Sequence, residues 1–227
     1  MTKIYRIIIF LTLINLPFST YAHIQHYEDL KRIEFDIYRN NKLIGTHIFS
    51  FKKLDGQLAV KSEINFKIKK FGIVFYTYHV EGTEIYEDGK LIKFNSKTNQ
   101  NGKEKYVNMI LENEEYTIDG SSYQGKVPED YLLGTWWNHS IVKAEAQISA
   151  VSGRIIKQKV TFLSKEIIKL SEKSYNTLHF NFASTDKKLT KGKKLNTDVW
   201  YDAETLNWVK ASFQKQGKWE YKLVSIN

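Results

Sequence analysis

The sequence predicts an all-β protein, mainly antiparallel, whose strongly curved sheet forms an open barrel or half-barrel with a short helical insert near 128–150. Three observations lead to this class. Apolar and charged residues alternate over long stretches, turn signals recur roughly every ten residues, and the alternation fails after Pro128. About a dozen strands with few helices to cover them must curl or stack, so a two-sheet sandwich is the alternative.

The clearest strand spans residues 58–69. Its apolar side chains share one parity, and its charged and amide side chains share the other. Because successive side chains of a strand point to opposite faces, one face lies on a core and the other in water. The apolar set is Leu58, Val60, Ile64, Phe66 and Ile68, and the polar set is Lys61, Glu63, Asn65, Lys67 and Lys69.

Two-residue turn signals divide the rest of the chain into hairpins. Asp-Gly and Asn-Gly pairs between apolar runs are strong hairpin signals. They and related pairs predict turns at Asn40-Asn41, Asp55-Gly56, Asp88-Gly89, Asn101-Gly102 and Asp119-Gly120. The further strands predicted between these turns and after Gly153 are 33–37, 43–51, 73–80, 83–86, 90–95, 106–111, 115–118, 156–162, 178–182, 199–201, 209–213 and 219–223.

The stretch from Pro128 to about Ala150 has no strand alternation. Pro128 is the sole proline after the N-terminal segment, and acidic residues at 129 and 130 follow it, as at the start of a helix. The stretch predicts one or two short helices or an irregular crossing segment. The lysine-rich segment 187–194 predicts a solvated loop.

The first 22 residues predict a signal peptide, which leaves 23–227 as a single β domain. Lys3 and Arg6 precede a short apolar run, and Thr20-Tyr21-Ala22 supplies the small residues of a cleavage site. The run is too short to span a bilayer as a helix. We therefore expect an exported, periplasmic protein with no transmembrane span after cleavage, the alternative being an uncleaved anchor.

Composition narrows the classes of partner. The chain has no cysteine, which excludes disulfides and thiolate metal sites, and its net charge of +9 comes almost entirely from lysine. Nucleic-acid sites tend to favour arginine, so we expect no nucleic-acid partner. The lysines at alternating positions indicate strand faces exposed to water. The alternative interpretation is that the positive charge attracts the protein to anionic lipid or polysaccharide surfaces.

The densest aromatic and polar cluster lies in the predicted insert, at Tyr131, Trp136, Trp137, Asn138 and His139. Apolar walls with a few polar groups are typical of ligand sites. We predict that these five residues bind a ligand and that Trp137→Ala abolishes binding without unfolding the protein. The alternative is a lid segment whose tryptophans plug the end of the barrel.

Other constellations point less clearly to chemistry. Glu84 and Asp88 could form an acid pair for glycoside hydrolysis, but surface charge beside a turn is the favoured interpretation. A cleaved N-terminal His23 could chelate copper with another histidine brought in by the fold. We predict no catalytic residues, no metal and no cofactor. An outer-membrane barrel is disfavoured because strand spacings are irregular.

Short motifs along the mature chain resemble a family of exported bacterial proteins known as a domain of unknown function. The resemblance implies a strongly curved antiparallel β fold, distantly similar to the half-barrels of the lipoprotein carriers LolA and LolB. It implies export and no reaction. The motifs are a first strand pair across an Ile44-Gly45 turn, the segment 83–91, Thr98-Asn99, Trp136-Trp137-Asn138, Val199-Trp200-Tyr201-Asp202, Trp208-Val209 and Tyr221.

The function predicted from these features is a monomeric periplasmic binding or carrier module. Its ligand would be a lipid or another apolar or amphipathic molecule of the cell envelope, held under the insert. A hydrolase acting on envelope glycan or lipid is one alternative. A structural module that binds an envelope partner is the other, and it would expose an apolar patch or an edge strand.

Overall fold

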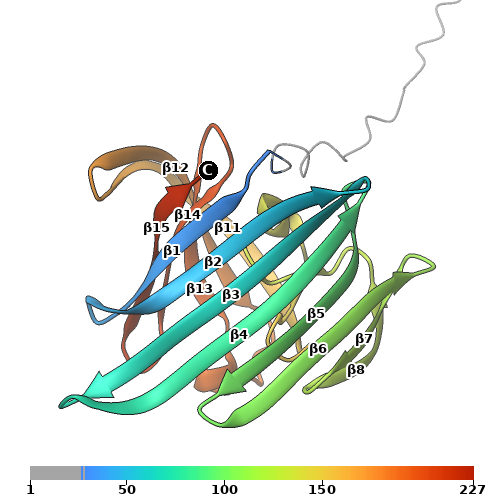
Figure 1. Ribbon diagram of the computed structural model, residues 1–227, viewed down its shortest axis with the longest axis horizontal. Coiled ribbons are helices and arrows are strands. Elements are labelled where there is room, and N and C mark those ends of the chain that lie inside the picture. Colours follow the sequence, from blue (N-terminus) through green and yellow to red (C-terminus); the bar gives the residue numbers. More distant parts are fainter. Residues whose placement is uncertain (1–26, 28) are drawn as a thin grey trace, which may run out of the picture.

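The computed structural model describes residue 27 and residues 29–227, and most of this part of the chain forms a single sheet of fifteen strands (Figure 1). The predicted signal peptide at 1–22 lies outside the described residues. The strands are β1 (Arg32–Arg39), β2 (Lys42–Leu54), β3 (Gln57–Lys70), β4 (Ile73–Glu87), β5 (Lys90–Gln100), β6 (Lys103–Glu112), β7 (Glu115–Gly120), β8 (Tyr123–Pro128), β9 (Leu132–Leu133), β10 (Ala146–Ile148), β11 (Ile155–Leu170), β12 (Lys173–Ser184), β13 (Asn196–Asp202), β14 (Trp208–Gln214) and β15 (Lys218–Ile226).

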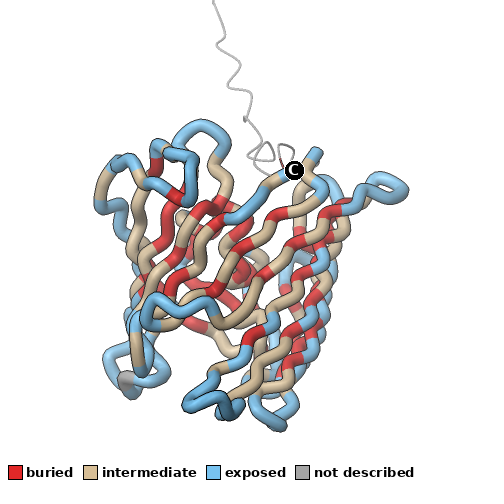
Figure 2. Tube along the Cα trace, turned by 60° about the vertical axis from the view of Figure 1, so that its left-hand side comes forward, coloured by how far each residue is buried: buried red, intermediate tan, exposed pale blue. Residues whose placement is uncertain are grey.

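The sheet curls strongly but does not close, which confirms the predicted fold class (Figure 2). β1 and β15 pair at its centre. The strands follow in chain order from β1 to the edge strand β8 on one side, and in reverse chain order from β15 to the edge strand β9 on the other. All neighbouring strands are antiparallel except β9 and β10. The concave face therefore forms the inside of an open barrel.

The predicted alternation decides which side chains face inward. Phe35 on β1 pairs with His47 on β2, which pairs with Ile64 on β3, and this row continues the apolar parity of residues 58–68. The inward residues form one contiguous core. Its largest fully buried side chains are Trp137, Trp208, Tyr27, Tyr201, Phe35, Phe49, Phe94 and Phe182.

Two predicted turns are wrong, and in both a glycine serves close packing. Ile44-Gly45 is a bulge inside β2, and the turn falls at Asn40-Asn41. Asp119-Gly120 ends β7, so that the chain turns one pair later. A Cβ on Gly45 would overlap the backbone oxygen of Asn65, and one on Gly120 would lie 2.8 Å from the oxygen of Ser152. A side chain at either position would collide with neighbouring backbone.

The insert after Pro128 crosses the concave side of the sheet. It contains β9, the 3-10 helix η1 (His139–Lys143) and β10, in keeping with the predicted short helix or irregular crossing segment. A second 3-10 helix, η2 (Lys191–Lys193), lies in the predicted lysine-rich loop. No helix in residues 29–227 has the length and apolarity needed to cross a membrane.

The strand directions gather the turns at two ends of opposite charge. We call the end with the β1–β2, β3–β4, β5–β6 and β14–β15 turns the basic end, and the other the acidic end. The turns, connections and adjoining strand ends of the basic end carry Arg39, Lys42, Lys69, Lys70, Lys103, Arg154, Lys187, Lys188, Lys193, Lys194, Lys215 and Lys218, with the acids Glu104, Asp119 and Asp186. Those of the acidic end carry Asp29, Asp55, Glu87, Asp88, Glu112, Glu114, Glu115, Glu129, Asp130, Glu172, Asp202 and Glu204, with the bases Lys31, Arg32, Lys53, Lys90, Lys169 and Lys173.

Candidate functional site

Trp137 from the insert fills the middle of the concave side and has no exposed surface. Its indole Nε1 donates a hydrogen bond of 2.9 Å to Oε1 of Glu84 on β4. The rings of Tyr27, Phe51 and Tyr86 meet it edge-on, with centroids 5.1, 5.3 and 5.5 Å away. Edge-to-face rings at these distances are favourable pairs. Trp137 thus serves as an internal plug of the half-barrel.

Glu84 is a fully buried carboxyl group and was not predicted as one. Burial raises its pKa to about 7, against side-chain hydrogen bonds from Tyr86, Trp137 and Thr135 that favour the ionised form. The Tyr86 hydroxyl donates to Oε2 at 2.5 Å. The interpretation of Glu84 and Asp88 as surface charge is therefore wrong for Glu84. The sequence did hold one indication of this burial, because Glu84 lies two residues before Tyr86 on β4 and its side chain therefore points to the same, inward face.

Trp136 adopts a left-handed backbone with φ of 62°. This conformation is unfavourable for a bulky residue. The Tyr201 hydroxyl donates to its carbonyl oxygen at 3.0 Å. The reversal lets two consecutive tryptophans both reach the core, because Trp136 meets Trp208 at 5.6 Å while Trp137 meets Glu84.

The other predicted ligand residues flank this plug. Asn138 caps η1, its Oδ1 accepting from the backbone N–H of Ser140 at 3.0 Å. The buried His139 ring lies edge-on to Tyr201 at 4.7 Å, and Tyr131 packs half-buried against the core. The structure brings residues 136–139 together as parts of the plug, and their ligand-binding role stays a prediction.

A second group of inward aromatics lies between the plug and the basic end. We call this group the concave aromatic surface. Phe66 is buried, and the other five side chains keep part of their surface exposed although they point to the inside. Burial still raises the pKa of the Tyr78 and Tyr221 hydroxyls well above its ordinary value. The six residues are Phe66, Tyr76, Tyr78, Phe213, Trp219 and Tyr221.

The rings of this surface contact one another between neighbouring strands and, in the case of Phe66 and Trp219, between β3 and β15, which are not neighbours. Phe66 stacks on Tyr78 with centroids 4.8 Å apart, and its edge meets Trp219 at 5.3 Å. Phe213 stacks on Trp219 at 5.8 Å with nearly parallel planes. Tyr221 lies 5.7 Å from Trp208, which links the surface to Trp136. The result is a continuous aromatic wall, and at its basic-end edge the Arg39 guanidinium carbon lies 5.8 Å from the centre of the Trp219 ring.

Four cations lie at the basic-end margin of the concave side, namely Lys103, Lys105, Lys215 and Arg154. Burial lowers the pKa of Lys105, and the charges of the other three lower it further. The Lys105 ammonium donates to the Gln100 side-chain oxygen at 2.5 Å. In the described part of the chain, none of the four cations has a carboxylate within ion-pair distance. An anion near them would relieve their mutual repulsion.

Three buried polar atoms around Trp208 have no hydrogen-bond partner among residues 29–227. They are Nε1 of Trp136, Nε1 of Trp208 and Nδ1 of His47. His47 uses its other nitrogen at 3.0 Å from Ser62 Oγ, and burial lowers its pKa to about 3, so the ring is neutral. Buried polar groups normally have partners. A ligand oxygen or a bound water would supply them here.

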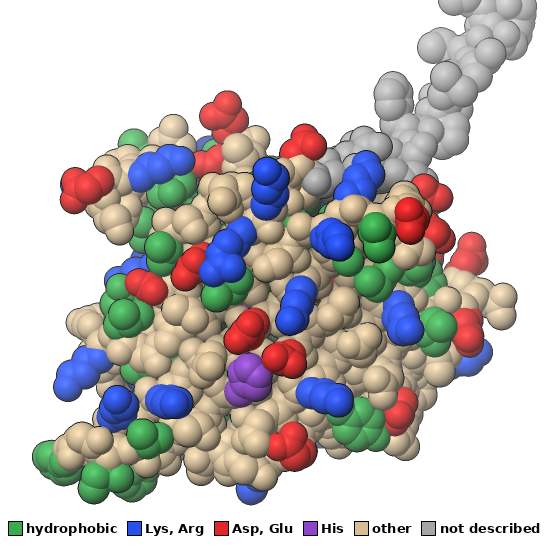
Figure 3. All heavy atoms as spheres, viewed as in Figure 1, with side chains coloured by type: hydrophobic (Ala, Val, Ile, Leu, Met, Phe, Trp, Pro, Cys, Tyr) green, Lys and Arg blue, Asp and Glu red, His purple; other side chains and the backbone are tan. Residues whose placement is uncertain are grey.

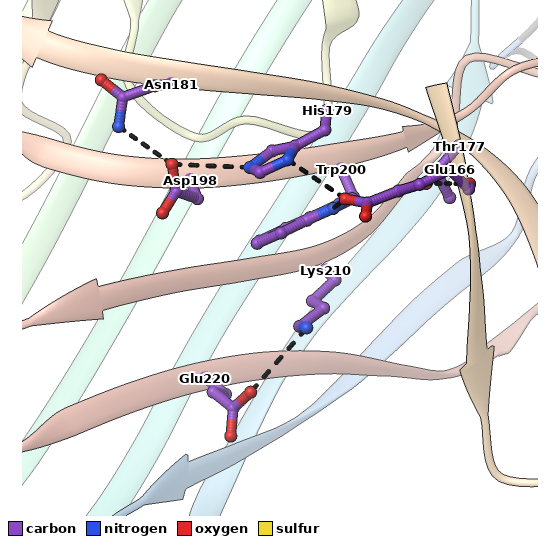
Figure 4. A network of polar contacts seen from close by, with 8 residues as sticks. All are labelled: Glu166, Thr177, His179, Asn181, Asp198, Trp200, Lys210 and Glu220. Atoms are coloured by element: carbon purple, nitrogen blue, oxygen red, sulfur yellow. Dashed lines mark hydrogen bonds and ion pairs between the residues drawn. The ribbon is translucent and has the colours of Figure 1, made fainter. Parts of the chain in front are cut away.

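The convex face carries a separate polar network on β11–β15 (Figure 4). His179 lies between Glu166 and Asp198, with Nδ1–Oε1 and Nε2–Oδ1 distances of 3.1 and 3.5 Å. Its ring stacks on Trp200 at 4.1 Å, and Trp200 Nε1 donates to Glu166 at 2.5 Å. No hydroxyl group of the described residues donates to His179. The network therefore links β11 to β13 across β12. Among the described residues it contains no hydroxyl nucleophile of the kind a serine-hydrolase triad requires.

The described residues contain no group of three or more histidines and carboxylates that could hold a metal. His23, on which the copper hypothesis rests, lies outside them. His47 is in the core, His79 faces Glu81 at 3.5 Å on the convex side, and His179 is held by its two acids. His139 is buried against Tyr201, and the copper hypothesis stays a prediction.

Two open grooves lie elsewhere on the molecule. One, of about 580 Å³, crosses the convex face of β5–β7 and is lined by Lys93, Asn95, Lys97, Tyr106 and Asn108 among others. The other, of about 450 Å³, lies at the acidic end between the start of β12 and the turn after Asp202. Asp202 caps that turn, since its Oδ1 accepts from the Thr205 N–H at 2.9 Å. Neither groove contains a predicted ligand residue.

Comparison with known proteins supports the architecture. A crystal structure of a β-barrel-like protein of domain of unknown function DUF1849 from Brucella abortus is similar, with a TM-score of 0.59 and 11% sequence identity. The match covers 87% of this chain and 97% of that one, and at such low identity it shows the fold alone. No curated protein matches the sequence. The family model described as a domain of unknown function, DUF6134, matches residues 35–224, and the chain belongs to that family.

Proposed function

We propose that the protein binds an anionic amphipathic molecule on the concave aromatic surface, as a binding or carrier module. The observation that carries the proposal is that Tyr76, Trp219 and Tyr221 point to the inside of the half-barrel and yet keep exposed surface. Aromatic walls with few polar groups are typical of ligand sites. The insert would limit the depth of the site, with Trp136 at its inner boundary.

The charge of the ligand follows from the four cations at the margin. A carboxylate or phosphate head group beside Lys103, Lys105, Lys215 and Arg154 would leave an apolar tail free to lie along the aromatic wall. The unpartnered N–H groups of Trp136 and Trp208 add hydrogen-bonding capacity near the inner boundary. Both features favour an amphiphile over a plain hydrocarbon.

A hydrolase is less well supported. Glu84 is the buried acid of the concave side, and it is fully enclosed by Tyr86, Trp137 and Thr135. A substrate could reach it only after the plug had moved. Export to the periplasm, a monomeric state and the likeness to lipoprotein-carrier half-barrels remain parts of this proposal. N-terminal sequencing of the protein secreted by a Gram-negative host tests the cleavage after Ala22.

The binding experiment uses cis-parinaric acid, a fluorescent fatty acid, titrated into protein expressed from the full chain. We expect Tyr76→Ser and Phe213→Ser to weaken binding by about tenfold, because each removes a ring from the wall. Lys105→Gln should weaken binding of the acid but not of the corresponding alcohol. Native mass spectrometry after gentle purification would reveal a ligand that copurifies.

Matched variants on the convex face serve as controls. Tyr106→Ser removes a tyrosine that is 39% exposed on the outside of β6, and Lys61→Gln removes an exposed cation of β3. Both should bind the probe as the parent protein does. Equal affinities for Tyr76→Ser and Tyr106→Ser, or no binding by the parent protein, would contradict the proposal.

A further inference from the structure

The turn between β3 and β4 exposes an apolar cluster at the basic end, which we call the hairpin tip. Phe71, Ile73, Val74 and Phe75 are 92%, 68%, 46% and 71% exposed. Figure 3 shows hydrophobic side chains gathered at the lower left, where this turn lies in Figure 1. A contiguous apolar cluster of this kind on a soluble surface marks an interaction site.

The turn chemistry makes the tip unusual within this chain. Phe71 has φ of 51°, in the left-handed region that favours Asn, Asp or Gly over a bulky aromatic. Of the six other two-residue hairpins with a left-handed first turn residue, one holds serine, Ser171, and five hold asparagine or aspartate, namely Asn40, Asp55, Asp88, Asn101 and Asn113. A phenylalanine at position 71 is therefore unfavourable for stability, because its backbone is left-handed and its ring is exposed to water. We infer that this residue is present for a role other than stabilising the hairpin.

The charges around the tip indicate what covers it. Lys67, Lys69 and Lys70 are exposed on the strand that leads to Phe71, and the Lys70 ammonium lies 5.5 Å from the Phe71 ring. The other turns of the basic end are also rich in lysine and arginine. Apolar side chains that project from a lysine-rich surface match a bilayer, with rings among the acyl chains and ammonium groups at anionic head groups.

We propose that the hairpin tip inserts into the surface of a membrane rich in anionic lipid, with the basic end facing the bilayer. The open margin of the concave aromatic surface then faces the membrane too, since Tyr76 and Tyr78 follow Phe75 on β4. Docking does not depend on the ligand, because no residue of the tip belongs to the concave aromatic surface. The partner is the lipid surface itself.

The experiment is cosedimentation of the full-chain protein with vesicles of phosphatidylcholine alone and with about a third phosphatidylglycerol. We expect binding to the anionic vesicles that weakens as salt rises. The triple variant Phe71→Ser, Ile73→Ser, Phe75→Ser should lose at least tenfold in partitioning. Lys67→Gln, Lys69→Gln and Lys70→Gln together should lose about 100-fold on anionic vesicles.

The matched control is Leu54→Ser with Ile167→Ser, two exposed apolar residues of the acidic end, 57% and 72% exposed. This variant should bind vesicles as the parent protein does. Retained binding by the tip variant, or no binding by the parent protein, would overturn the proposal. So would concentration-dependent dimerisation that the tip variant abolishes, because a second copy would then be the occupant. Parinaric acid binding by the tip variant separates this test from that of the ligand site.

Discussion

The rings of Phe66 on β3 and Trp219 on β15 lie 5.3 Å apart although β2 and β1 run between their strands. Neighbouring strands are spaced by about 4.8 Å, so the contact requires a sheet that is sharply curved at this point. Gly45 on β2 pairs with Phe66 and presents no side chain beneath the two rings. The bulge at Ile44 adds to the local twist.

Gly45→Ala should destabilise the protein by about 1 to 3 kcal/mol, because its Cβ would overlap backbone atoms of β3. The midpoint of urea unfolding measures the effect. Gly192→Ala is the control, since nothing lies within 4 Å of a Cβ at that position. Similar midpoints for the two variants would show that the curvature does not depend on Gly45.

The buried carboxyl group of Glu84 should make the protein less stable as pH rises. Its pKa is about 7 when folded and near 4.5 when unfolded, so between these values the unfolded chain binds fewer protons. The free energy of unfolding should fall by about 3 kcal/mol over this range and then level off. Glu84→Gln should remove this fall, as urea titrations at about pH 4 and pH 8 would show. Parallel pH profiles for the two proteins would contradict the expectation.

Glu220 on the convex side of β15 should behave in the opposite way. Burial alone would raise its pKa, but the hydrogen bond from Lys218 and the charges of Lys222, Lys218 and Lys210 hold its pKa below the ordinary value. Its ionised form therefore stabilises the fold above the unfolded pKa, and this contribution is lost as pH falls. Glu220→Gln should cost about 1 kcal/mol near neutral pH and little below about pH 4. A cost that is constant with pH would show that the charge plays no part.

Trp137→Ala should reduce stability by about 3 to 5 kcal/mol, because it leaves a large cavity and removes a donor from Glu84. This replaces the expectation from sequence that the variant loses only ligand binding. Trp219→Ala, at a half-buried position, should cost clearly less while weakening the binding of parinaric acid. Differential scanning calorimetry compares the two. A stable Trp137→Ala protein that cannot bind the probe would restore the prediction from sequence.

The alternation of side chains sufficed to predict most strands and the inward parity, because a half-buried strand must repeat every two residues. The exceptions have a physical cause in tertiary contacts. Gly45 and Gly120 resemble turn glycines locally, yet they serve close approaches of backbone from distant strands. Glu84 lies on the inward-facing side of β4. Its burial could still not be predicted from the strand pattern, because an acid is normally solvated unless hydrogen-bond donors from other segments enclose it, as Trp137 and Thr135 do here. The left-handed backbone of Trp136 is held by Tyr201, 65 residues away, and no local pattern predicts it.

The pairing of β1 with β15 at the centre of the sheet also bears on the order of folding. Each arm, from β1 to β8 and from β10 to β15, is a run of hairpins between consecutive strands, whereas Ile33 must find Ile226 at the other end of the chain. Closing such a loop costs conformational entropy before any contact repays it. We expect the two arms to form first and the central seam to set the rate. A circular permutant that joins Asn227 to Tyr27 through a short linker, which keeps the buried Tyr27 ring, and opens the chain in the 128–131 connection should therefore refold faster than the parent protein in stopped-flow experiments.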